Sequence, residues 1–157
     1  MTGDIPSPYT AFSRGTHQLS HNNNVIAILN TSIDLVEVLQ EILEREGYNT
    51  VGALISDFKR GRRSLVDFMR EHDPAVVIYD LPPPYEENIS YLRDILNMKI
   101  MEDRQFIYTT TNKRALSEIE GFKEETVEII GKPMDLNEVL KQVQKASEKR
   151  KTSPLKV

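Results

Sequence analysis

The stretch AVVIYDLPPP, residues 75–84, carries an apolar run directly up to an aspartate and then into three prolines. An uninterrupted apolar run of this length is typical of a strand that is buried on both faces, as in a parallel sheet. The prolines predict the end of the strand, because proline cannot donate to a sheet ladder. Asp80 is therefore expected at the end of a buried strand, where an unpaired charge is costly to bury.

Similar apolar runs occur on both sides of this stretch, and segments with one-sided helical stripes separate them. The predicted strands are residues 25–29, 50–55, 75–79, 105–109 and 127–130, and the predicted helices are 33–48, 63–71, 89–96, 112–120 and a last helix capped by Asp135. The alternation predicts an α/β fold, a single doubly wound five-stranded parallel sheet in a three-layer sandwich. In such sheets, ligands bind at the carboxyl ends of the strands, so functional residues are expected there.

Composition limits the classes of protein that need to be considered. The chain has 157 residues, 39% apolar and 28% charged, with a formal net charge of −4 and no cysteine. These values indicate one globular domain, no general attraction to nucleic acid or membranes, and no thiolate metal site. We expect a disordered tail over residues 1–24, a domain over 25–147 and a basic tail over 148–157, in a cytoplasmic protein.

Four of the predicted strands end in polar residues. They are Asn30 and Thr31 at the end of the first strand, Asp80 at the end of the third, Thr109, Thr110 and Thr111 at the end of the fourth, and Lys132, followed by Pro133, at the end of the fifth. In a parallel sheet these ends converge on one edge, so a carboxylate, a hydroxyl and an ammonium group are expected to share a pocket. A hydroxyl and a cation are also what a transferred phosphoryl group needs around it.

Over residues 25–147 the chain resembles the receiver domains of response regulators in two-component signalling. The resemblance rests on AVVIYD with Pro84 four residues after the aspartate, on the threonines at 109–111, and on GKPMDLNEVLKQV at 131–143. It implies a flavodoxin-like strand order, 2-1-3-4-5. It also implies that Asp80 accepts a phosphoryl group from a histidine kinase or phosphotransfer protein, and that Thr110 and Lys132 bind the phosphoryl oxygens. Pro133 would fix the turn after the lysine, and Pro84 would lie in the loop that walls the pocket.

The chain departs from this family at the metal site. Receivers place two adjacent acidic residues after the first strand to hold Mg²⁺, whereas these positions are Asn30 and Thr31 here. An amide oxygen and a hydroxyl are weak ligands for a hard dication, so we expect poor Mg²⁺ binding. Thr111 stands where the family usually has a smaller residue and would crowd the phosphoryl site. Two hypotheses remain open: Asp80 is phosphorylated despite these changes, or the domain is a pseudo-receiver that works without phosphorylation.

The predicted function is therefore that of a stand-alone receiver-like signalling protein, not an enzyme, that acts by binding a downstream protein. A flavin- or nucleotide-binding protein is a weaker hypothesis, because the loop NTSID at 30–34 lacks glycine. A nucleic-acid adaptor could use the basic residues at 59–63 and the basic tail, but the overall negative charge of the chain opposes it. The segment SDFKRGRRS at 56–64, which contains these residues, looks like an insertion between the second strand and the second helix. The PPPY motif at 82–85 matches a WW-type ligand, although prolines also suit the loop after this strand.

Overall fold

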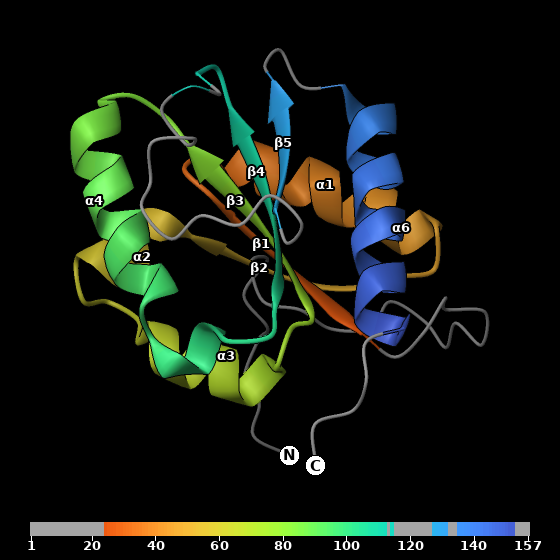
Figure 1. Cartoon of the computed structure of the whole chain (residues 1–157), viewed down its shortest axis with the longest axis horizontal. Coiled ribbons are helices and arrows are strands. Elements are labelled where there is room, and N and C mark those ends of the chain that lie inside the picture. Colours follow the sequence, from red (N-terminus) through yellow and green to blue (C-terminus); the bar gives the residue numbers. More distant parts are fainter. Residues whose placement is uncertain (1–23, 113, 115–126, 132–134, 153–157) are drawn as a thin grey trace.

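A five-stranded parallel sheet forms the centre of the computed structural model, which describes residues 24–112, 114, 127–131 and 135–152 (Figure 1). The strand order is β2-β1-β3-β4-β5, and every neighbouring pair is parallel. The strands are β1 (Val25–Asn30), β2 (Asn49–Leu54), β3 (Val76–Leu81), β4 (Gln105–Thr110) and β5 (Val127–Gly131). The predicted doubly wound, flavodoxin-like architecture is confirmed.

Helices cover both faces of the sheet (Figure 1). On one face lie α1 (Ile33–Arg45) and α6 (Leu136–Thr152). The other face carries α2 (Ile55–Lys59), α3 (Leu65–His72), α4 (Tyr85–Leu96) and the 3₁₀ helix η1 (Lys99–Met101). None of the helices in these described ranges is long and apolar enough to cross a membrane.

Capping side chains set the helix starts that the sequence predicts. Ser32 accepts a hydrogen bond from the Leu35 amide at the start of α1, and Asp135 accepts one from the Asn137 amide, 3.0 Å away, at the start of α6. At Gly52 of β2, an added Cβ would lie 2.4 Å from Val36 Cγ1 of α1. Glycine therefore allows α1 to pack closely on the sheet.

Several predicted boundaries are wrong. The helix predicted over 33–48 ends at Arg45, and the helix predicted over 89–96 already begins at Tyr85. Residue 55 does not end the second strand but begins α2, a helix of 5 residues that contains the first part of the 56–64 segment. The helix predicted over 63–71 begins two residues later, because Ser64 caps α3 through the Asp67 amide. The predicted helix over 112–120 lies almost entirely outside the described residues.

The apolar core is divided by the sheet into two clusters, to which alternate strand residues contribute. Ile78 of β3 and Ile107 of β4 pack with α1 and α6, whereas Tyr79 and Tyr108 pack with α3 and α4. This alternation assigns each residue at the carboxyl end of a strand to one face.

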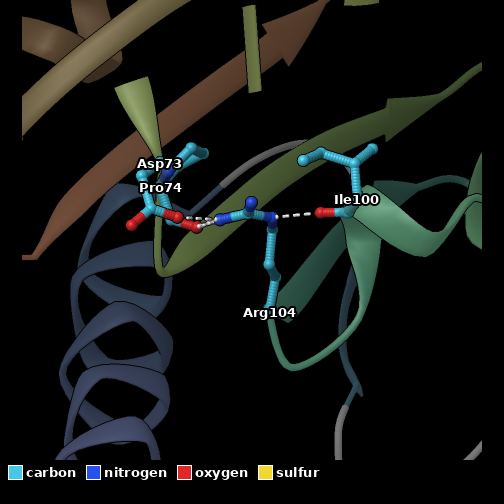
Figure 2. Close-up of polar contacts among 4 residues, drawn as sticks. All are labelled: Asp73, Pro74, Ile100 and Arg104. Carbon is cyan, nitrogen blue, oxygen red and sulfur yellow. Dashed lines mark hydrogen bonds and ion pairs between the residues drawn. The ribbon is translucent and has the colours of Figure 1, made fainter. Parts of the chain in front are cut away.

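At the amino edge of the sheet, Arg104 joins the chain segments that lead into β3 and β4 (Figure 2). Its Nε donates to the Ile100 carbonyl at 2.8 Å, and its Nη1 donates to the Pro74 carbonyl at 2.6 Å and to Asp73 Oδ1 at 2.8 Å. The Arg104 side chain is only 8% exposed, whereas that of Asp73 is 77% exposed. The two backbone carbonyls therefore depend on the guanidinium group more than the surface carboxylate does.

Replacing Arg104 with methionine should lower the free energy of unfolding by about 2 kcal/mol, because two carbonyls lose a charged donor. Urea titration measures this loss. Arg45→Met is the matched control: Arg45 pairs with Glu41 on the surface, and the two side chains are 72% and 51% exposed. The control should cost less than about 0.5 kcal/mol. Equal losses in the two variants would contradict the role assigned to Arg104.

His72 gives the fold a pH dependence. Its ring centroid lies 4.9 Å from that of Phe68, and its side chain is 18% exposed. Burial lowers the pKa of His72 below its ordinary value of 6.5; Arg63 lowers it further, and Glu71 opposes the shift. The unfolded chain therefore takes up a proton at a higher pH than the folded chain does. Neutral His72 therefore contributes to the stability of the fold. This contribution is fully present above pH 6.5 and is lost as the pH falls through the lower pKa of the folded state.

In His72→Gln, the loss of unfolding free energy on acidification from about pH 7.5 to about pH 5.5 should be smaller than in the unaltered chain, because the glutamine does not titrate. Urea titrations at the two pH values measure the difference. An unchanged pH dependence would show that His72 is not the group responsible.

Candidate functional site

The candidate site is built around Asp80, near the carboxyl end of β3. The residue is 2% exposed and pairs in register with Thr109 of β4. Thr109 Oγ1 donates to Asp80 Oδ1 at 2.7 Å, and Thr31 Oγ1 donates to Asp80 Oδ2 at 3.2 Å. Each carboxylate oxygen thus accepts a hydroxyl hydrogen bond, and the carboxylate joins the ends of β1, β3 and β4.

Thr109 was not singled out in the sequence, whereas Thr110 was. Along β4, Thr109 follows the alternation of Ile107 and lies on the same face as Asp80. Thr110 continues the alternation of Tyr108 toward the opposite face, and its hydroxyl accepts a hydrogen bond from the Asn112 amide at 3.1 Å. The structure therefore brings the Thr109 hydroxyl to Asp80, and the phosphoryl-binding role of Thr110 stays a prediction. The alternation of β4 is a signal that could have identified Thr109.

Asn30 ends β1 beside this cluster and is 1% exposed. Its Oδ1 accepts hydrogen bonds from the backbone amides of Thr31, at 2.7 Å, and Ser32, at 3.0 Å. These two donors fix the orientation of the side-chain amide. Its Nδ2 is buried and has no hydrogen-bond acceptor among the described residues. The amide oxygen of Asn30 is thus used to turn the backbone into α1.

The described residues do not fit a Mg²⁺ ion. They contain no group of three or more His, Cys, Asp or Glu side chains that could hold a metal. Among the described residues, Asp80 is the one carboxylate that the Thr31 and Thr109 hydroxyls contact, and each of its oxygens already accepts one of these hydrogen bonds. Asp34 lies in the first turn of α1, where it complements the positive end of the helix dipole. Mg²⁺ requires several hard oxygen ligands, and these positions do not supply them.

The loop after Asp80 is fixed to neighbouring elements. Pro84 precedes α4, whose first residue, Tyr85, makes a hydroxyl contact with Thr111 beyond the end of β4. Asn88, one turn further along α4, donates through Nδ2 to the Pro82 carbonyl at 2.8 Å. The predicted pocket residues Pro84 and Thr111 therefore lie in segments joined by Tyr85.

The remaining predicted site residues, Lys132 and Pro133, lie outside the described residues. The strand that leads to them is described: β5 ends at Gly131, which pairs in register with Thr110 of β4. The fifth strand thus ends at the same edge as the other strands. The phosphoryl-binding role of Lys132 and the turn role of Pro133 stay predictions.

Comparisons with known proteins agree on the fold. No family model matches the sequence, and no curated protein matches it significantly. Among solved structures, chemotaxis response regulator CheY4 of Vibrio cholerae is 18% identical with a TM-score of 0.60, and the match covers 80% of this chain and 99% of that one. A signal receiver domain of an HD domain-containing protein from Pseudomonas fluorescens is 16% identical with a TM-score of 0.63, covering 84% and 100%.

A response regulator from Thermotoga maritima is similar too, at 17% identity and a TM-score of 0.57, covering 81% of this chain and 99% of that one. These identities are low, so the likeness is one of architecture. The sheet order and the helices on both faces agree with it. This chain has the fold of a response-regulator receiver domain.

Proposed function

We propose that this chain is a receiver-type signalling protein that works by binding a downstream protein, without phosphorylation of Asp80. The observation that carries the proposal is the state of the Asp80 carboxylate: it is buried, and hydroxyl groups of Thr109 and Thr31 donate to its two oxygens. The receiver fold supports a signalling role rather than an enzymatic one. The proposed receiver-like domain comprises residues 25–147, and α6 continues past it to Thr152.

An acceptor carboxylate must attack phosphorus with a free lone pair, and positive charge must offset the phosphoryl oxygens. The described residues meet these requirements poorly. Hydrogen bonds from the Thr109 and Thr31 hydroxyls leave a lone pair on each oxygen of Asp80 but stabilise the carboxylate and so weaken it as a nucleophile. The neighbouring positions Asn30 and Thr31 are neutral. A phosphoryl group would add negative charge at a residue that is 2% exposed. Lys132 remains the proposed cation for Asp80, and on this proposal it stabilises the carboxylate itself rather than a phosphoryl group.

Nucleotide or flavin binding at the first loop has less support. The backbone amides of Thr31 and Ser32 already donate to Asn30 Oδ1. These amides are therefore not free to hold a phosphate, as a phosphate-binding loop requires.

The first test is incubation with Mg²⁺ and acetyl phosphate, followed by intact mass measurement. The unaltered chain should show no phosphoryl adduct, because its acidic pair is replaced by neutral residues. Asn30→Asp/Thr31→Asp restores two carboxylates at the metal positions and should gain an adduct that the additional change Asp80→Asn removes. An adduct on the unaltered chain that Asp80→Asn abolishes would sink the proposal and favour Asp80 as a phosphoacceptor in a phosphorelay.

The second test compares two neighbouring threonines. Thr109→Val keeps the shape of the side chain but removes the donor to Asp80 Oδ1, and should cost about 1–3 kcal/mol of unfolding free energy. Thr110→Val removes only an acceptor for the half-buried Asn112 amide and should cost less, about 0.5–1 kcal/mol. Urea titration measures both losses. A larger loss for Thr110→Val would mean that Thr109 does not hold the carboxylate.

A double-mutant cycle isolates the contact itself. Thr109→Val and Asp80→Ala should be coupled by about 1 kcal/mol, because each removes one partner of the same buried hydrogen bond. The same cycle with Thr110→Val is the matched control and should show little coupling. Additive effects in both cycles would contradict the contact.

A further inference from the structure

Four cationic residues lie together at the end of α2 and in the turn that follows. Lys59, Arg60, Arg62 and Arg63, here called the basic surface, fall within five positions of a chain whose formal net charge is −4. Gly61, between them, has φ +75 and provides the left-handed residue that the tight turn needs. The first three cations are exposed, and Arg63 is half-buried.

Aromatic rings hold Arg63 in place. Its guanidinium carbon lies 5.0 Å from the centroid of the Phe68 ring and 5.7 Å from that of Phe58. The two rings meet edge to face, with centroids 5.4 Å apart, and the phenylalanines are 3% and 9% exposed. This packing joins α2 to α3 and fixes the position of the guanidinium group.

Polar contacts hold two further cations. Lys59 Nζ donates to Asn88 Oδ1 at 2.5 Å and lies 5.2 Å from the centroid of the Tyr91 ring. Arg62 Nε donates to Asp57 Oδ1 at 2.8 Å, yet the Arg62 side chain remains 52% exposed. Cations that are already held lose less conformational entropy when a ligand binds.

The charge of this surface is largely uncompensated. Asp57 pairs with Arg62, and no other carboxylate within the described ranges forms an ion pair with Lys59, Arg60 or Arg63. The side chain of Arg60 makes no hydrogen bond or ion pair with any residue that the structure describes. Four cations against one carboxylate leave a concentrated positive charge on an otherwise acidic protein, and such a surface attracts an anionic partner.

We propose that the basic surface docks an acidic segment of a partner protein, rich in Asp and Glu. Guanidinium groups match carboxylates in geometry as well as in charge. Single-stranded nucleic acid fits less well, because its bases need exposed aromatic faces for stacking. The Phe58 and Phe68 rings are buried, and Arg63 lies over them.

The basic surface is also connected to the candidate site. Asn88 accepts from Lys59 and donates to the Pro82 carbonyl, two residues after Asp80. One side chain of α4 thus holds both the docking surface and the loop of the site. The proposal rests on the proposed function only in assuming that the chain acts through a protein partner, so the phosphorylation test at Asp80 and the docking test can fail independently.

The test measures fluorescence anisotropy of a labelled peptide in which glutamate alternates with serine, titrated with the full chain at low salt. Labelled single-stranded DNA of matched charge is the second probe. Arg60→Glu/Arg62→Gln should weaken peptide binding about tenfold, and Arg60→Glu alone about threefold, since an exposed ion pair contributes up to about fivefold. Arg60→Glu removes none of the contacts described for Lys59, Arg62 and Arg63. A loss of peptide affinity in this variant would therefore not reflect a folding defect.

The matched control is Arg45→Glu/Lys141→Gln, which changes the net charge equally but lies on α1 and α6, on the opposite face of the sheet. It should weaken peptide binding less than about twofold, because only long-range charge is altered. Circular dichroism verifies that each variant is folded. The proposal is overturned if the unaltered chain does not bind the peptide, if the control loses as much affinity, or if the DNA binds more tightly than the peptide.

Discussion

The buried carboxylate of Asp80 is the constraint on which the arrangement at the carboxyl edge depends. A buried anion is tolerated only where donors meet it, and the donors here come from the residue after β1 and from β4, the strand beside β3. Parallel register makes this possible, because Asp80 and Thr109 lie side by side where their strands end. The same hydrogen bonds that stabilise the charge keep three chain segments together and make the carboxylate a weaker nucleophile.

On the proposed function, the position of Asn30 explains how the receiver fold can be kept without a metal site. An acidic residue at this position would face Asp80 with a second charge and would need a cation between them. The neutral amide avoids this repulsion, and its oxygen binds the amides of Thr31 and Ser32 at the start of α1. On the proposed phosphorylation-independent function, local structure that stabilises this turn takes the place of a metal ligand.

The fold could be predicted from the sequence because continuous apolar strands and one-sided helical stripes alternate along it, and the strand order followed from the resemblance to receivers. Other features depend on information that periodicity does not carry. The helix α2 has 5 residues, too few for a visible period. Thr109 was overlooked because all three threonines suit a strand end, and only the pairing with β3 shows which hydroxyl faces Asp80. Arg104 binds backbone carbonyls of segments distant in sequence, which no motif records.

A domain whose central carboxylate is fixed must respond through another part of the molecule. The amino edge of the sheet is held by Arg104 and the carboxyl edge by Asp80. Among the described segments, the loop between β3 and α4 makes contacts that a docked partner could exchange. Asn88 holds that loop at Pro82 and shares its other hydrogen bond with Lys59 of the basic surface. A carboxylate docked at Lys59 would compete with Asn88 Oδ1 for the ammonium group. On the proposals made above, partner docking and the loop after Asp80 are therefore linked in both directions, as any coupling between two sites must be.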